Sequence, residues 1–313
     1  MSKDLKKPKI AVLLASYNGS FFIEKQLDSI LSQEHVDVTI IVNDDFSTDG
    51  TYEILSQMSK NHKNIKLLSQ KKFGTPTKNF HHLLNSDDFL NYDYVALSDQ
   101  DDLWFPDKMH NAHLGITSRK AVGYSSDVIA KYFNGKEIYV KKSHPLKKYD
   151  YFFESAGPGC TYVFKSFIAQ EYIAFIDAHP KEVDIVDSHD WLLYAYTRSK
   201  NYGWYIDNHA TMHYMQHENN KVGVNLGLKA YYKRLIDVFQ GNYRARCLII
   251  SSLFMDNNQE LRKLLSVRWL PGLLLLKYIT EIRRSPKDQV VLALLIIFGL
   301  FRTNKKSRII RNL

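Results

Sequence analysis

Residues 9–45 read KIAVLLASYNGSFFIEKQLDSILSQEHVDVTIIVNDD, and this stretch carries the pattern that decides the fold. Its two apolar runs, 9–15 and 38–43, have the length of buried strands. Between the two runs, apolar residues recur at helical spacing: Phe22, Ile23, Leu27, Ile30 and Leu31. A strand, a helix and a second strand in this order predict a right-handed βαβ unit with parallel strands.

The alternation of strands and helices continues along the chain and predicts an α/β fold with a mostly parallel sheet flanked by helices. Residues 120–165 have the pattern of further strands and loops. The other predicted segments are strands at 64–68, 94–97 and 202–206, helices at 49–60, about 77–86 and 187–199, and a polar loop at 213–220.

Polar clusters stand directly after three of these strands. Ser16-Tyr17-Asn18 follows the first strand, Asp44-Asp45 the second, and Ser98-Asp99-Gln100-Asp101-Asp102 the fourth. Ligands of open parallel sheets bind beyond the carboxyl ends of the strands. We therefore expect the three clusters to meet at one ligand-binding edge.

The sequence LSDQDDLWFPDK at 97–108 has the strongest chemical signal. Neighbouring carboxylates repel one another unless a cation neutralises them. Oxygen ligands in one loop suit Mg²⁺ or Mn²⁺, which also take ligands from a substrate phosphate. The alternative is a solvated acidic turn before a helix that starts near Pro106.

Three motifs in this order, ASYNG at 15–19, NDDFSTDGT at 43–51 and SDQDD at 98–102, resemble the inverting glycosyltransferase family 2 with the GT-A fold. The resemblance covers roughly residues 8–220 and is strongest to bacterial rhamnosyltransferase-like enzymes of O-antigen and capsule assembly. It implies transfer of a sugar, with a preference for rhamnose, from a nucleotide-sugar donor to a hydroxyl. The implied acceptor is a glycan or a lipid-linked glycan.

The resemblance also implies the residues that bind the nucleotide. Ala15, Ser16 and Tyr17 would line the nucleotide pocket. Asp45, with Asp44 beside it, resembles the acid that accepts a hydrogen bond from the base. The family usually has glycine where this chain has Phe46, and a Phe does not easily adopt positive φ, so a differently shaped turn is expected there.

The same resemblance assigns the metal site. Asp99 would lie near the ribose and the metal, and Asp101 would be the direct metal ligand to the diphosphate. The stretch YMQHENN at 214–220 is similar to a segment of rhamnosyltransferase-like members, so His217 is a third candidate ligand, although a solvated loop histidine is the alternative. Asp49, with Ser47 and Thr48, has the simpler interpretation of a helix cap.

The segment His189-Asp190-Trp191 resembles the catalytic-base position of the family. Inverting transfer needs a carboxylate that accepts the proton of the acceptor hydroxyl, which indicates Asp190. Because the leaving group is a diphosphate that a metal stabilises, no separate acid is required. The alternative makes Asp190 or Asp187 an acid at a helix N-terminus, with Asp187 the candidate cap.

The two cysteines, Cys160 and Cys247, lack metal-ligand spacing and are too few for a disulfide framework. We expect a reducing compartment, with Cys160 a small buried side chain. The first apolar run is too short for a signal peptide and is interpreted as the first strand, which predicts a cytoplasmic protein.

The net charge of +9 originates in the last part of the chain, because residues from 261 onward contain 12 Lys and Arg but only Glu281 and Asp288 as acids. Nucleic acid is therefore not an expected partner of the main domain, whereas an anionic membrane surface suits this region. The apolar stretches 269–279 and 290–301 are too short to span a bilayer, so helices lying on the membrane are expected. Two helices packed in a core are the alternative.

The predicted organisation is a GT-A catalytic domain at 1–225 and a helical, basic region at 226–313, on the inner face of the cell membrane. Two other functions use related features. A sugar-phosphate nucleotidyltransferase would share the acidic pair but needs a Gly-rich phosphate loop, which is not evident near the first strand. A non-catalytic membrane scaffold would not need Asp99, Asp101 and Asp190 together.

Overall fold

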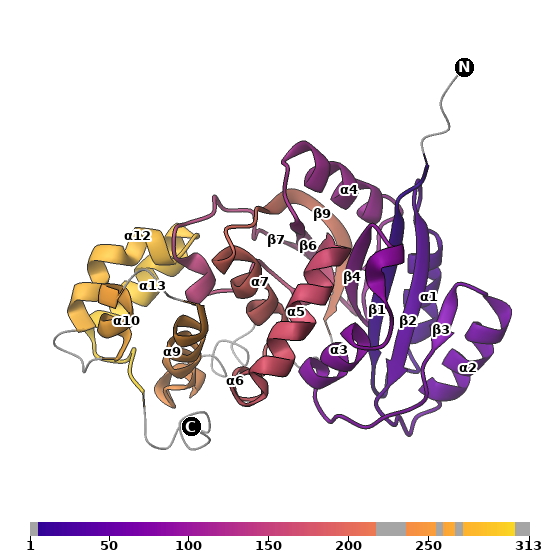
Figure 1. Cartoon of the computed structure of the whole chain (residues 1–313), viewed down its shortest axis with the longest axis horizontal. Coiled ribbons are helices and arrows are strands. Elements are labelled where there is room, and N and C mark those ends of the chain that lie inside the picture. The colour runs from indigo at the N-terminus through magenta and orange to yellow at the C-terminus, as the bar shows by residue number, and fades with distance from the viewer. Residues whose placement is uncertain (1–5, 217–235, 255–258, 267–271, 304–313) are drawn as a thin grey trace. The chain divides into compact units, whose positions relative to one another are not determined.

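The computed structural model describes residues 6–216, 236–254, 259–266 and 272–303 (Figure 1). The chain divides into two compact units. The first comprises residues 1–143, 157–178 and 202–218, and the second comprises 144–156, 179–201 and 219–313. This division differs from the predicted boundary near residue 225, because two earlier segments pack with the C-terminal residues.

Among the described residues, the first unit has one nine-stranded sheet in the order β3-β2-β1-β4-β8-β6-β9-β5, with β7 paired to β6. Strands β1, β2, β3 and β4 are mutually parallel, as predicted. Beyond β4 the sheet is mixed, since β8 is antiparallel to both β4 and β6. The strands are β1 Lys9–Ser16, β2 Asp37–Asp44, β3 Ile65–Leu67, β4 Tyr94–Asp99, β5 Leu103–Trp104, β6 Gly123–Tyr132, β7 Glu137–Val140, β8 Val163–Lys165 and β9 Trp204–Gln216.

Helices cover both faces of this sheet, and α3 and α5 lie in front of the strands in Figure 1. The buried apolar residues of α1 are Ile23, Leu27 and Ile30, at the spacing that predicted a helix. Helix α3 begins after Thr75, whose hydroxyl accepts a hydrogen bond from the Lys78 amide. The helical segments of the unit are α1 Ile23–Leu31, α2 Thr51–Asn61, α3 Pro76–Leu84, η1 Phe89–Asn91, α4 Lys108–Ser118, η3 Gly159–Thr161 and α5 Ser166–Ala178.

The register of the parallel strands aligns their carboxyl ends. Ser16 at the end of β1 pairs with Asp44 on β2, and Ala15 pairs with Asp99 on β4. Leu13 and Leu14 of β1 are adjacent and both fully buried, so both faces of this strand lie in the core, as is typical of a parallel strand covered by helices on both sides. The observed pairing therefore places the polar residues that follow these strands beside one another.

The predicted polar loop at 213–220 is wrong for residues 213–216, which continue strand β9. Met212, Tyr214 and Gln216 are buried while His213 and Met215 are more accessible, which is the period of a strand. The remaining residues of that segment, His217 among them, lie outside the described part of the chain.

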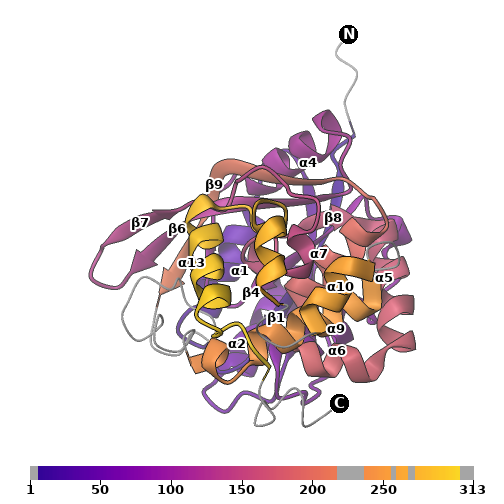
Figure 2. The same ribbon diagram turned by 90° about the vertical axis from the view of Figure 1, so that its left-hand side faces the viewer.

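In the second unit, every described element is helical. Figure 2 shows its helices α9, α10 and α13. No described helix of either unit is long and apolar enough to cross a membrane. The elements are η2 Asp150–Phe152, α6 Pro180–Val186, α7 His189–Ser199, α9 Asn242–Phe254, α10 Gln259–Ser266, η4 Leu273–Tyr278, α12 Ile279–Ile282 and α13 Pro286–Ile297.

Candidate active site

The loops that follow β1 and β2 are joined by hydrogen bonds. The Asn18 amide donates to Ser47 Oγ at 2.8 Å, and Asn18 Oδ1 accepts from the Thr48 amide at 2.9 Å. The Gly19 amide donates to Thr51 Oγ1 at 2.8 Å. Asn18 has a φ of 48°, a conformation that asparagine tolerates better than most residues. Hydrogen bonds from backbone amides to side-chain oxygens thus join the loops that follow two of the three strand ends.

The Asp49 side chain links the start of α2 to the loop after β1 by hydrogen bonds. Its carboxylate accepts the amide of Thr51, the first residue of α2, at 3.1 Å and the amide of Ser20 at 3.0 Å. Burial by itself would raise the pKa of Asp49. The hydrogen bonds from Thr51 and Ser20 outweigh burial, so the pKa of Asp49 is lower than its usual value. The role at a helix terminus agrees with the sequence interpretation, although Gly50 occupies the N-cap position.

Gln100, the central residue of the acidic motif, clamps the β1 loop. Its Oε1 accepts the Tyr17 amide at 2.7 Å and the Ser16 hydroxyl at 3.2 Å, and its Nε2 donates to the Tyr17 carbonyl at 2.8 Å. A Cβ on Gly19 would lie 2.3 Å from Gln100 Oε1, so glycine makes this approach possible. No role of its own was predicted for Gln100, because an amide between two acids has no distinctive spacing.

Asp45 is buried at the end of β2 and accepts two backbone amides. Oδ1 accepts the Phe73 amide, and Oδ2 accepts the Gly74 amide at 2.8 Å. Phe46 has a φ of 59°, so the expectation that this turn would avoid positive φ is wrong. The turn keeps the left-handed conformation and exposes the Phe46 ring to solvent.

The Asp44 carboxylate is fully buried and accepts hydrogen bonds from Ser47 in the loop and from Gln70. Its Oδ2 accepts the Ser47 amide at 2.9 Å and the Gln70 side-chain amide at 2.7 Å, and its Oδ1 accepts the Ser47 hydroxyl. These contacts fix the loop that presents Asp45.

At the end of β4, ligand atoms of Asp99, Asp102 and Cys160 lie within 4.8 Å of one another. Asp102 is only 1% exposed, and no hydrogen bond from the described residues reaches either of its carboxylate oxygens with good geometry. Burial, followed by the charges of Asp101 and Asp99, raises the pKa of Asp102 well above its usual range. The Cys160 thiol contributes only a weak hydrogen bond to Asp102, and a cation between Asp99 and Asp102 would stabilise the ionised carboxylate.

Lys108 brings a fixed ammonium group into this region. Its Nζ donates to the Cys160 carbonyl at 3.1 Å and lies 4.5 Å from the centroid of the Trp104 ring. Burial lowers the pKa of Lys108 to about 8. The ammonium partly offsets the charge of Asp102. The burial of this lysine was not predicted from the sequence, because lysines are almost never fully buried.

The donor set fits a hard divalent cation held by carboxylates. Burial and the nearby Asp102 and Asp99 raise the pKa of the Cys160 thiol well above its usual value, and a protonated thiol is a poor ligand. The structure thus groups Asp99 with Asp102, whereas the sequence indicated Asp99 with Asp101. Asp101 is half-buried in the same loop, and His217 lies outside the described residues.

Asp190 lies in the first turn of α7, in the second unit. Its Oδ1 accepts the Ser188 hydroxyl at 2.7 Å and the Trp191 amide at 2.8 Å. Both hydrogen bonds fall on one oxygen, which leaves Oδ2 available for a proton as far as the described residues show. Asp187, the expected cap of this helix, instead ends α6 with a φ of 43°, so Ser188 is the N-cap.

Comparisons with known proteins point to one family. The model described as "Glycosyl transferase family 2" matches residues 11–167. A dTDP-rhamnosyl transferase RfbG of Shigella flexneri is 41% identical over 92% of this chain and 100% of its own length. A putative teichuronic acid biosynthesis glycosyltransferase TuaG of Bacillus subtilis is 30% identical over 46% of this chain and 52% of its own.

Solved structures show the same fold at low sequence identity. The S. aureus TarS fragment 1–349 in complex with UDP-GlcNAc has a TM-score of 0.53 at 15% identity, covering 93% of this chain and 87% of its own. The mannosyltransferase PcManGT from Pyrobaculum calidifontis, in complex with GDP-Man and Mn²⁺, has a TM-score of 0.54 at 14% identity, covering 98% and 86%. The α/β GT-A architecture predicted from the sequence is thereby confirmed.

Proposed function

This chain belongs to glycosyl transferase family 2, and on that premise we propose that it moves rhamnose from dTDP-rhamnose to a hydroxyl of a glycan or lipid-linked glycan, with inversion at the anomeric carbon. That the chain is a glycosyltransferase of polysaccharide synthesis follows from the family and its relatives. The donor sugar rests on the similarity to the rhamnosyl transferase.

One observation supports the proposal most directly. The buried carboxylate of Asp102 lies with Asp99 at the end of β4, and Gln100 between them clamps the loop at Ser16 and Tyr17. A nucleoside diphosphate has a flat base at one end and an anionic diphosphate at the other. A backbone-lined loop beside a cation site fits those two ends.

For the donor, we assign the base and ribose to the loops after β1 and β2. Ala15 and Ser16 would line this pocket beside the exposed ring of Tyr17, whose backbone amide and carbonyl are held by Gln100. Asp45 would accept the imide N–H of the base with lone pairs that Phe73 and Gly74 leave free. Asp44 would act indirectly, because its carboxylate already serves the turn.

For the diphosphate, the proposed ligands of Mg²⁺ or Mn²⁺ are Asp99 and Asp101, with Asp102 and His217 as further candidates. When bound, such an ion would neutralise the charge that develops on the leaving diphosphate. The fully buried Lys108 would support the acidic loop, with its ammonium already held by the Cys160 carbonyl and the Trp104 ring.

For the acceptor, Asp190 is the proposed base. As the acceptor oxygen attacks the anomeric carbon, the bond to the diphosphate breaks with its electron pair, and the hydroxyl proton passes to the carboxylate. The Ser188 hydroxyl and the Trp191 amide hold Oδ1, so Oδ2 would take the proton.

The chain would work as a cytoplasmic protein lying on an anionic membrane. On α13, Val290, Leu294, Ile297 and Phe298 are exposed and recur at helical spacing. The sequence around this helix is strongly basic, which complements anionic lipid headgroups.

The donor assignment is tested by incubating the purified chain with dTDP-rhamnose, UDP-glucose, UDP-galactose, UDP-GlcNAc or GDP-mannose in the presence of Mn²⁺ and a membrane extract as acceptor source. We expect release of free nucleoside diphosphate with dTDP-rhamnose and its loss in excess chelator. Turnover of a different donor would overturn the rhamnose assignment, and full activity in chelator would overturn the metal site.

A further inference from the structure

Helix α7 carries Asp190 at its first turn and, one and two turns further on, Tyr194 and Arg198. Residues four apart on a helix share one face. Tyr194 and Arg198 meet a fully buried carboxylate, Asp150, on the 3₁₀ turn η2. The Tyr194 hydroxyl donates to Asp150 Oδ2 at 3.1 Å, and Arg198 Nη1 lies 3.2 Å from Asp150 Oδ1.

The second cation of this cluster comes from the C-terminal region. Arg284 Nη1 donates to Asp150 Oδ2 at 3.2 Å and to the Tyr194 hydroxyl at 3.3 Å. Its Nη2 donates to the Ser155 carbonyl, and its backbone amide donates to Glu154 Oε1 at 2.7 Å. Residues more than 80 positions apart in sequence are therefore joined through one buried carboxylate.

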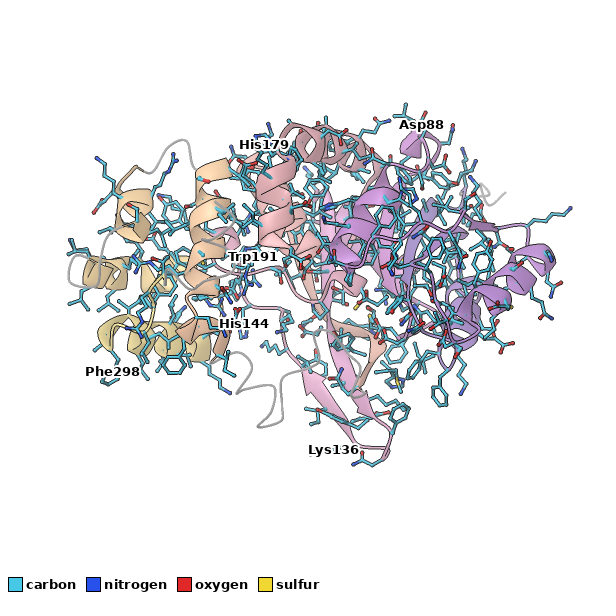
Figure 3. All side chains as sticks on the ribbon, turned by 90° about the horizontal axis from the view of Figure 1, so that it is seen from below. Asp88, Lys136, His144, His179, Trp191 and Phe298 are labelled. Carbon is cyan, nitrogen blue, oxygen red and sulfur yellow. The ribbon has the colours of Figure 1, made fainter. Side chains whose placement is uncertain are left out.

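A second attachment holds the residue next to the proposed base. Trp191, which Figure 3 labels, donates from its indole Nε1 to the Tyr151 carbonyl at 2.9 Å. Its ring stacks on Tyr243 at a centroid distance of 6.1 Å, and the Tyr243 hydroxyl donates to the Phe153 carbonyl at 2.8 Å. Arg283 Nη1 donates to the same carbonyl at 2.9 Å.

These contacts restrain α7 at two positions along its axis. Trp191 and Tyr194 are three residues apart on the same side of the helix, and each is hydrogen bonded to the segment 150–155. The helix can then neither rotate about its axis nor slide along it without breaking a buried polar contact. A buried ion pair adds little net stability compared with apolar packing, so a geometric role explains the cluster better than a stabilising one.

We propose that Asp150, Tyr194 and Arg284 are positioning residues that act through α7 to hold the Asp190 carboxylate where it accepts the acceptor proton. The inference rests on the proposed role of Asp190. It gives the C-terminal residues a part in catalysis that is separate from membrane attachment. General-base catalysis is sensitive to displacements of about 1 Å, which is the scale that a loosened α7 would allow.

The primary test is Tyr194→Phe, which removes one hydroxyl and keeps the ring. At saturating substrates we expect kcat to fall about tenfold or more, with the dissociation constant of dTDP-rhamnose unchanged. In an Asp190→Asn background the same substitution should cause no further loss, because both changes act on one step. Additive losses in the two backgrounds would overturn the inference.

A buried arginine elsewhere in the same unit is the matched control. Arg244 and Arg284 are each 5% exposed, but Arg244 bonds the carbonyls of Leu264, Leu265 and Phe301. Arg284→Met should lower kcat, whereas Arg244→Met should lower only the melting temperature. Equal losses of kcat in both variants would show that the effect is general destabilisation and would overturn the positioning role.

Two different outcomes distinguish an error in the proposed role of Asp190 from an error in this inference. Full turnover by Asp190→Asn would remove the proposed base and, with it, the positioning role. An inactive Asp190→Asn combined with an additive Tyr194→Phe effect would leave the base in place and overturn the positioning role alone.

Discussion

At the scale of single residues, the carboxylates differ mainly in what already satisfies them. Asp44 and Asp45 accept backbone amides, whereas the described residues leave Asp102 buried without a good donor. Sequence spacing treats Asp99, Asp101 and Asp102 alike, because it does not show which side chain turns inward. The burial of Asp102 therefore separates a carboxylate that needs a cation from those that serve a turn.

The first prediction concerns the pH dependence of stability at Asp102. Burial, with Asp101 and Asp99, raises its folded pKa above the unfolded value of 3.8. Stability from such a group is fully present below the unfolded pKa and is lost as pH rises through the folded pKa. We expect the melting temperature of the cation-free protein to fall as pH rises above the unfolded value of 3.8 and through the raised folded pKa, and Mn²⁺ to restore more of the melting temperature on the alkaline side.

Asp102→Asn serves as the control for this prediction. It removes the titrating group, so the fall in melting temperature with pH should become shallower and the protection by Mn²⁺ smaller. Identical pH profiles for the two proteins, measured by calorimetry in chelator, would contradict the assignment.

The second prediction compares two neighbouring acids. Asp190→Asn should leave the dissociation constant of the donor unchanged and lower turnover by about 10² to 10⁴, the range for loss of a general base. Asp187 ends α6 in a left-handed conformation that Asn tolerates well, so Asp187→Asn should change stability by less than about 1 kcal/mol. Calorimetric titration and a transfer assay on both variants make the comparison. If Asp187→Asn is inactive while Asp190→Asn is active, the assignment of the base to Asp190 is wrong.

At the scale of elements, loops are fixed by contacts between segments that are distant in sequence. Gln100 follows β4 yet determines the conformation of the loop after β1. The tip of the hairpin formed by β6 and β7, near the Lys136 labelled in Figure 3, is placed by the pairing of those two strands. The hairpin joins consecutive strands and has a local signature in Asn134-Gly135, whereas the Gln100 clamp has none because it depends on sheet order.

The third prediction uses this clamp. Gly19→Ala places a methyl group 2.3 Å from Gln100 Oε1, so the amide must move and the loop at Tyr17 loses its hydrogen bonds. We expect donor affinity to fall about tenfold, which is the loss of one net hydrogen bond. Gln100→Ala removes the clash, so the double variant should lose less than the sum of the two single losses.

Gly272→Ala is the control for this experiment, because a Cβ there meets nothing within 4 Å. Its donor affinity, measured by the same titration, should equal that of the unmodified chain. Strictly additive effects of Gly19→Ala and Gln100→Ala would contradict the clamp.

The fourth prediction concerns the exposed apolar face of α13. Phe298 is 68% exposed and, as Figure 3 labels, lies at the end of this helix. Leu294→Ser with Phe298→Ser should weaken co-sedimentation with phosphatidylserine vesicles, and salt should weaken it further because charge is screened within about 10 Å at 0.1 M. Leu114→Ser, an exposed leucine of α4, is the matched control and should bind as before. Unchanged binding of the double variant would place the membrane contact elsewhere.

At the scale of the whole molecule, the C-terminal region cannot be removed as an independent attachment. Arg283 and Arg284 pair with Asp150 and Glu154, and Asp150 is fully buried. Breaking a buried pair by removing one partner costs about 3–5 kcal/mol.

The fifth prediction follows from these buried pairs. A truncation that deletes residues 262–313 should lower the melting temperature and expose Asp150. The measurement is a thermal denaturation series of the truncated and full-length chains. A truncated chain with an unchanged melting temperature would contradict the described packing. Point substitutions on α13 are therefore the cleaner test of membrane binding.

The sequence alone determined the βαβ alternation, the alignment of polar clusters at the strand ends and the family. These properties depend on hydrophobic periodicity and short motifs, which are local and can be recognised in the sequence alone. The two units of the chain, the inward turn of Asp102, the clamp by Gln100 and the support of α7 by Arg284 were decided only in the tertiary structure. Each depends on which distant segments pack together, and the free energy of burying a charge or an amide depends on that packing rather than on spacing along the chain.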